Sequence, residues 1–143
     1  MPLNPRISHL PAKSGQAPVF LAMAVSDAGT SQMPGTSLQR LQVIKGWYDE
    51  AGDHHQEVFD VAGTANDGAS VSLVTCEAQG SGHEQLCAVW QDPEFKANQS
   101  AVYYRRGVEN PSCRYTTWQC NALPKAERPA DCENPQVPKV LQE

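Results

Sequence analysis

The fold class is indicated by a stretch in the middle of the sequence, Leu41-Gln42-Val43-Ile44-Lys45-Gly46-Trp47-Tyr48, which is followed by Asp49-Glu50-Ala51-Gly52-Asp53 and then by Glu57-Val58-Phe59-Asp60-Val61. The outer two runs are rich in β-branched and aromatic residues, and the first begins with apolar and polar residues in alternation. The residues between them favour a turn. The stretch therefore predicts a β-hairpin.

Other short runs extend this pattern in both directions. Residues 19–25 are apolar throughout and too few for a typical helix, which predicts a buried strand. Residues 71–76 and 86–90 lie on either side of a Gly-rich connection at 79–82, which predicts a second hairpin. Residues 101–106 fit a strand or a short helix. We therefore expect a mainly β fold, an antiparallel sheet or sandwich, because no interval resembles the long crossover helix of a parallel sheet.

The sequence divides into three parts. Residues 1–16 predict a disordered or non-native tail, and residues 17–122 contain the expected strands. Residues 123–143 include four prolines and few residues that could pack, so we expect an irregular C-terminal segment held by cysteines.

Composition narrows the classes of partner. A chain of 143 residues corresponds to about one domain. With 11 Lys and Arg against 16 Asp and Glu, the net charge is −5, which argues against nucleic acid and anionic membrane surfaces. The longest apolar run, residues 19–25, is far shorter than the roughly 20 residues that span a bilayer.

Cysteine content indicates an oxidising compartment. All five cysteines lie in the second half of the chain, and residues 1–16 lack the hydrophobic segment of a signal peptide. We therefore expect a periplasmic or secreted parent protein whose export signal is not in this chain. No two cysteines have the two-residue spacing of a zinc knuckle, so disulfides are the better interpretation. We predict the pairs Cys76–Cys87 and Cys120–Cys132, with Cys113 left free or paired across an oligomer.

One acidic turn contains potential metal ligands. His54 and His55 lie beside Asp49 and Asp53, and His83 is the further histidine that could join them. Adjacent strand residues point to opposite faces, so a solvated acidic turn is the competing interpretation. The candidate catalytic residues are therefore His54, His55, His83 and Cys113, and the candidate metal ligands are Asp49, Asp53 and His55.

Four further residues are candidates for binding. Arg105 and Arg106 carry guanidinium groups that match phosphate or carboxylate geometry, although on a strand only one can face a given pocket. Trp47 and Trp90 are large enough to form core, a contact surface or a sugar platform.

Four segments carry a resemblance to a known family: LQVIKGW at 41–47, VFDVA at 58–62, LCAVWQDPEF at 86–95 and AVYYRRGVENPSCR at 101–114. In order and spacing they resemble the C-terminal region of a bacterial family of unknown function, over roughly residues 18–132. The longer members of that family are similar to PHP-type (polymerase and histidinol phosphatase) metallohydrolases.

The resemblance implies a module without a catalytic centre. The metal-binding motifs of the family lie upstream of the matched region, and no position of this chain matches them. We therefore expect a structural and interaction module from the C-terminal end of a PHP-like metallohydrolase, with no evident cofactor. Its partner is expected to be the remainder of the parent hydrolase or a second copy of the chain. The alternative is a minimal metal-dependent phosphoesterase that binds zinc or manganese through His and Asp residues, within the chain or at a subunit interface.

Overall fold

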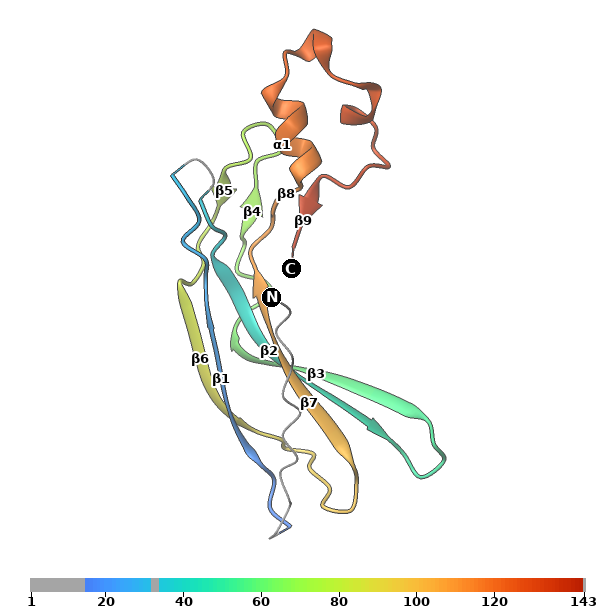
Figure 1. The fold of residues 1–143 in the computed structure, drawn as a ribbon. Coiled ribbons are helices and arrows are strands. Elements are labelled where there is room, and N and C mark those ends of the chain that lie inside the picture. The colour runs from blue at the N-terminus through green and yellow to red at the C-terminus, as the bar shows by residue number, and fades with distance from the viewer. Residues whose placement is uncertain (1–14, 32–33, 143) are drawn as a thin grey trace.

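The structure is a computed structural model that describes residues 15–31 and 34–142. Two antiparallel layers form the body of the molecule (Figure 1). One layer is the ribbon of β1 (Val19–Val25) and β6 (Gln85–Gln91). The other is a sheet in the order β3 (His54–Gly63), β2 (Leu38–Tyr48), β7 (Ala101–Glu109). The predicted mainly β, antiparallel fold is confirmed.

Strand β2 is the centre of the larger layer. It pairs antiparallel with β3, with Val43 opposite Phe59, which confirms the predicted hairpin. It pairs on its other edge with β7, where Val43 lies opposite Arg105. Residues 101–106, which fitted a strand or a short helix, are thus part of a strand.

Local irregularities in β2 bring more of its residues into the interior. The register with β7 shifts between Leu38 and Arg40, so Gln39 has no opposite partner. Leu38 and Leu41 are three residues apart and both are buried, at 4 % and 0 % exposure, because this bulge interrupts the alternation. They form the core with Ala22 and Leu86 from the other layer.

The predicted hairpin between residues 71–76 and 86–90 is wrong. Strand β6 pairs with β1, and Leu21 lies opposite Val89. Only Ser70–Val71 form a strand, β4, which pairs with β5 (Ala78–Gln79). After β4 the chain turns, because the Cys76 N–H donates to the Ser72 carbonyl at 2.7 Å and Cys76 has a φ of +58°.

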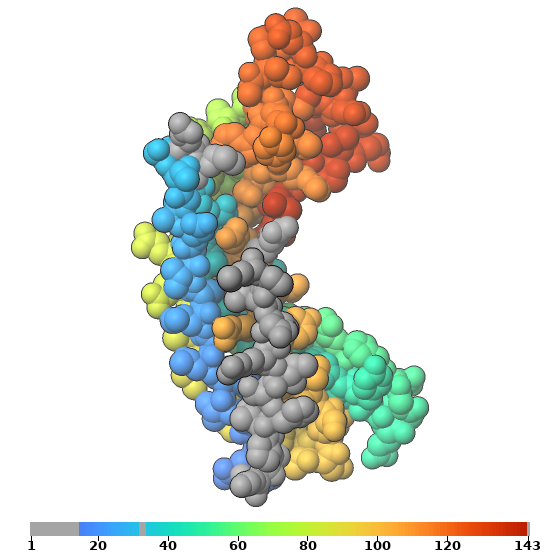
Figure 2. Space-filling view, in the orientation of Figure 1, coloured from blue at the N-terminus to red at the C-terminus, as the bar shows by residue number. Residues whose placement is uncertain are grey.

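The C-terminal segment forms a cap at one end of the elongated molecule (Figure 2). Strand β8 (Ser112–Cys113) pairs with β9 (Val140–Leu141), and between them lie α1 (Tyr115–Ala122), η1 (Lys125–Glu127) and η2 (Ala130–Cys132). A helix of this length needs external support. It comes from Thr117, whose hydroxyl donates to the Lys139 carbonyl, and from the disulfide Cys120–Cys132.

The two disulfides correct part of the cysteine assignment. Cys120–Cys132 is confirmed as predicted. The predicted Cys76–Cys87 pair is wrong: Cys76 bonds to Cys113 and ties the turn after β4 to β8. Cys87 is the free, exposed cysteine, because on β6 it lies opposite Met23 and faces away from the core.

Two sequence predictions concern the ends of the chain and its relation to membranes. A tail was expected over residues 1–16, and residues 1–14 of it lie outside the described residues. In the described parts of the chain, no helix has the length and apolar character needed to span a bilayer.

Candidate functional site

The turn between β2 and β3 is organised around Asp49. One carboxylate oxygen, Oδ1, accepts hydrogen bonds from the N–H groups of Ala51 (3.0 Å) and Asp53 (2.9 Å). The other, Oδ2, lies 2.7 Å from His55 Nε2, and the His55 ring stacks on Trp47 with centroids 5.4 Å apart. The His55 contact, followed by the Asp53 N–H, holds the pKa of Asp49 below its ordinary value. Asp49 and His55 are thus a preformed pair at the end of the hairpin.

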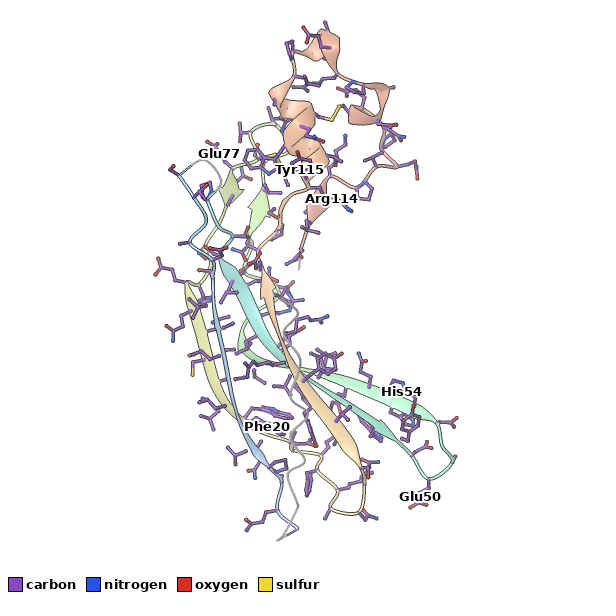
Figure 3. The ribbon with its side chains drawn as sticks, viewed as in Figure 1. Phe20, Glu50, His54, Glu77, Arg114 and Tyr115 are labelled. Atoms are coloured by element: carbon purple, nitrogen blue, oxygen red, sulfur yellow. A yellow bond between two sulfur atoms is a disulfide. The ribbon has the colours of Figure 1, made fainter. Side chains whose placement is uncertain are left out.

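The other candidate ligands do not join this pair. His54 lies on the opposite face of β3 and contacts Tyr48 with its ring, near the free end of the hairpin (Figure 3). His83 bridges to Leu38 at the other end of β2. A strand rises about 3.3 Å per residue, so the run from Leu38 to Trp47 separates His83 from His55 by roughly 30 Å.

The arrangement does not fit a metal centre. Within residues 15–31 and 34–142, no group of three or more His, Cys, Asp or Glu side chains is gathered as metal ligands. Catalytic zinc uses three protein ligands, and here Asp49 and His55 supply two groups that bond to each other. Asp53 contributes its backbone N–H to the turn.

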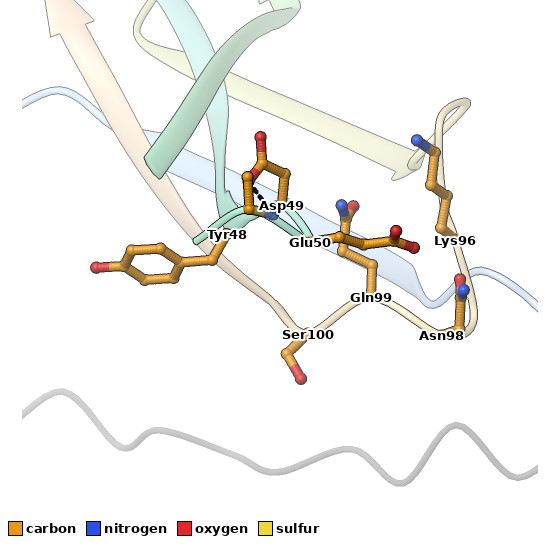
Figure 4. Close-up of a pocket in the computed structure, with 8 residues that line it drawn as sticks. Tyr48, Asp49, Glu50, Lys96, Asn98, Gln99 and Ser100 are labelled. Atoms are coloured by element: carbon orange, nitrogen blue, oxygen red, sulfur yellow. Dashed lines mark hydrogen bonds between the residues drawn. The ribbon is translucent and has the colours of Figure 1, made fainter. Parts of the chain in front are cut away.

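An open depression of about 580 Å³ lies between this turn and the loop after β6. Its walls include Tyr48, Asp49 and Glu50 on one side and Lys96, Asn98 and Gln99 on the other, as Figure 4 shows. These groups are polar and mostly exposed. The depression therefore lacks the apolar enclosure typical of a small-molecule site.

A buried polar group that was not predicted from the sequence lies between the two layers. Lys45 Nζ lies 2.6 Å from Asp92 Oδ2, and the two side chains are 3 % and 0 % exposed. The Tyr103 hydroxyl donates to the same oxygen at 2.6 Å, and the Glu94 N–H donates to the other at 2.8 Å. Lys45 also donates to the Glu94 carbonyl at 3.0 Å. The group fixes the start of the β6–β7 loop under the sheet.

Burial and hydrogen bonding shift the pKa values of Asp92 and Tyr103. Burial alone would raise the pKa of Asp92, but the bonds from Lys45, Tyr103 and Glu94 outweigh it and leave that pKa below its ordinary value. Burial, and then the bond to Asp92, raise the pKa of Tyr103 well above its ordinary value. Asp92 therefore stays ionised, and Tyr103 stays protonated, at neutral pH.

Trp90 belongs to the aromatic packing around this group. Its ring lies 5.0 Å from Phe59 and 5.9 Å from Phe20, and Phe20 lies 4.8 Å from Tyr103. The label in Figure 3 marks Phe20 between the two layers. Trp90 is therefore partly buried core, while Trp47 packs on the end of the hairpin beneath Lys45 and His55.

Arg105 and Arg106 face opposite sides of the sheet. Arg105 shares the inner face with Val43, and Arg106 shares the outer face with Gln42. Arg106 donates to Gln42 Oε1 through Nε (3.0 Å) and Nη2 (2.6 Å), and Gln42 in turn donates to Asp60 at 2.6 Å. A polar row thus crosses all three strands on the outer face.

Next to this row, apolar side chains of the two edge strands are exposed on the outer face, around Ile44, which is itself buried. Val58, Ile44 and Tyr104 are opposite one another across the three strands. Val58 and Tyr104 are 43 % and 53 % exposed, and Val102 on the same face is 64 % exposed. An apolar patch bordered by hydrogen-bonded charges is typical of a protein interface.

The cap offers little for catalysis. Cys113 is disulfide-bonded, so its candidacy as a nucleophile is wrong: it has no thiol to ionise. A second open depression, of about 620 Å³, lies beside α1. Its basic side chains are engaged with the backbone, since Arg128 donates to the Leu123 carbonyl and Lys139 to that of Cys132.

The sequence did contain a signal for the buried group. Lys45 is in phase with Leu41 and Val43, so it occupies an inward position of an otherwise apolar strand face. A lysine at such a position needs an anion nearby. The partner, Asp92, is 47 residues away along the chain and carries no local mark of this role.

Comparison with protein families gives one result. The family model described as "Protein of unknown function (DUF3604)" matches residues 5–143. Neither the comparison with curated proteins nor the comparison with solved structures gives a match. Since the match covers nearly the whole chain, this protein belongs to the DUF3604 family of proteins of unknown function.

Proposed function

We propose that this chain is a non-catalytic interaction module that supports a PHP-like metallohydrolase. The observation that carries the proposal is the outer face of the β3–β2–β7 sheet. There an apolar patch of Val58, Tyr104 and Val102, called the sheet patch below, borders the polar row from Asp60 to Arg106. The partner is the metal-binding domain of such a hydrolase, on which the sheet patch would pack.

The build of the module suits a supporting role. The Lys45–Asp92 pair is enclosed by protein and leaves no opening for a substrate at its reactive atoms. The Asp49–His55 pair is engaged in its own turn, since Asp49 accepts two backbone N–H groups and contacts His55. Rigid strands carry the sheet patch, which favours recognition of a fixed partner surface.

Two disulfides support an extracytoplasmic setting for this module. Disulfides persist in oxidising compartments and are rare in the cytosol. We therefore place the parent hydrolase in the periplasm or outside the cell.

The non-catalytic part of the proposal is tested by metal content and activity. The chain is purified without a metal-affinity tag, analysed by elemental mass spectrometry, and assayed on activated phosphate and carboxylate esters with and without a chelator. We expect no bound metal and no turnover. Near-stoichiometric zinc or manganese, with turnover lost on chelation and in His55→Ala, would establish the minimal metallohydrolase in its place.

The interaction part is tested by co-expression with the metal-binding part of a longer family member. We expect the two chains to co-purify, and Tyr104→Lys to abolish this by placing a charge in the sheet patch. Tyr115→Lys is the matched control, since Tyr115 is also exposed but lies in the cap. Equal binding by the wild type and Tyr104→Lys would remove the sheet patch from the interface.

A further inference from the structure

The ribbon of β1 and β6 has a second exposed apolar face, turned away from the sheet. Register and exposure assign to it Val19, Leu21, Met23, Val25, Cys87 and Val89. Leu21 and Val89 lie opposite each other and are 67 % and 73 % exposed. Neither strand contains a charged residue. This set is called the ribbon face below.

Strands β1 and β6 have the composition of strands covered on both sides. β1 is apolar at every position, whereas β3 and β7 place polar residues among their apolar ones. Continuous apolar strands are typical of layers buried on both faces, and contiguous exposed apolar surface usually marks an interaction site. β1 also lacks the lysine or proline that protects a free sheet edge. The ribbon thus has the character of a middle layer, which a further apolar surface would cover.

We propose that the third layer is the ribbon face of a second copy of this chain, in a two-fold symmetric dimer. The inference rests on the proposed role as an interaction module, and it names a partner for a different face. Each copy carries a net charge of −5, so like charges repel across most pairs of surfaces. The ribbon face is uncharged and therefore allows two copies to approach without that repulsion. About a two-fold axis the same apolar residues of the two copies would face one another, as such a dimer requires.

The size of the ribbon face sets the strength of the dimer. Its apolar residues and the neighbouring Gln85 and Gln91 are far fewer than the roughly 20–30 residues that each partner contributes to a standard interface. The dimer is therefore weak and reversible, with a Kd on the order of micromolar or higher. The Cys87 thiol, opposite Met23 near the middle of the ribbon, is accessible in the monomer and covered in the dimer.

Sedimentation velocity of the whole chain, from low micromolar to millimolar concentration, tests the proposal. We expect the average mass to rise from that of a monomer to that of a dimer. Val89→Lys should raise the dissociation constant by about 100-fold or more, because two unpaired ammonium groups would be buried. Val102→Lys is the matched control, a valine of similar exposure in the sheet patch, and should leave dimerisation unchanged. Leu21→Gln provides an uncharged second variant if Val89→Lys fails to fold.

The reaction of Cys87 with a thiol reagent gives an independent readout. Its rate per thiol should fall as the wild-type protein becomes more concentrated, and should stay constant in Val89→Lys. A chain that remains monomeric at millimolar concentration overturns the proposal. Equal dissociation constants for the dimers of Val89→Lys and Val102→Lys also overturn it. Protection of Cys87 only on adding the metal-binding domain would identify that domain as the occupant and also overturn it. None of these readouts depends on enzymatic activity, so the dimer and the non-catalytic role can fail separately.

Discussion

Replacing Lys45 by methionine tests the role of the buried pair most directly. The change keeps most of the side-chain volume but leaves the Asp92 carboxylate, which is fully buried, without the cation 2.6 Å away. Removing one partner of a buried ion pair costs about 3–5 kcal/mol. Because the free energy of unfolding of a domain is about 5–15 kcal/mol, the variant should lose about a fifth of it or more. Tyr103 and the Glu94 N–H remain as donors to Asp92, which favours the lower end of this range.

The pH dependence of this loss identifies its cause. In the wild type the pKa of Asp92 lies below its ordinary 3.8, so its stabilising contribution is present above that value and is lost as the pH falls through the lowered pKa. In Lys45→Met the lysine no longer offsets burial, so the pKa of Asp92 should be higher than in the wild type and protonation should relieve the buried charge as the pH falls. The difference between the two proteins should therefore shrink between about pH 7 and about pH 4.5.

Urea unfolding followed by tryptophan fluorescence measures this difference, since Trp47 and Trp90 both lie beside the group. Lys125→Met is the control: this lysine is exposed, and its replacement should change the free energy of unfolding by less than about 0.5 kcal/mol. A deficit below about 1 kcal/mol in Lys45→Met, or one that is the same at both pH values, would refute a buried, charged Asp92.

Three further predictions concern the cap and the turns. Cys113→Ser should lower the free energy of unfolding by about 4 kcal/mol, because the lost disulfide closes a separation of 37 residues. Cys87→Ser at low protein concentration should leave this free energy unchanged. Urea titration without reductant compares the two variants. Gly63→Ala should lower the melting temperature more than Gly52→Ala. Both positions have positive φ, but an added Cβ lies 2.2 Å from a backbone oxygen at Gly63 and meets nothing at Gly52. Asp49→Ala should speed amide hydrogen exchange in the β2–β3 turn, since two N–H groups lose their acceptor; unchanged exchange there would contradict the role given to this carboxylate.

The sequence predicted the parts of the fold whose partners are close along the chain. The β2–β3 hairpin was recoverable because both strands and their turn lie within one window, and Cys120–Cys132 because only 12 residues separate the two cysteines. The same preference for near partners produced the errors. Cys87 is closer to Cys76 in sequence than Cys113 is, but its position on β6 turns it outward.

Contacts between distant segments had no local signal. The pairing of β1 with β6 joins Val19 to Gln91, and the ion pair joins Lys45 to Asp92. No turn signal marks β1 and β6 as partners, because strands β2 to β5 lie between them along the chain. The separation of His54 from His55, in contrast, follows from the sequence alone, because adjacent residues of a strand point to opposite faces.

Side chains alternate between the two faces of each strand, and the residues at the outward positions form the two proposed interfaces. In β7 the outward positions change along the strand from Val102 and Tyr104 to Arg106, so this side of the sheet is part apolar and part hydrogen-bonded. Such a surface can recognise a specific, different protein, because a partner must match both its shape and its charges. The outward positions of β1 carry no polar group at all, so nothing there selects against a second copy. One chain can therefore hold its own copy with the ribbon face while the sheet patch remains free for a different partner.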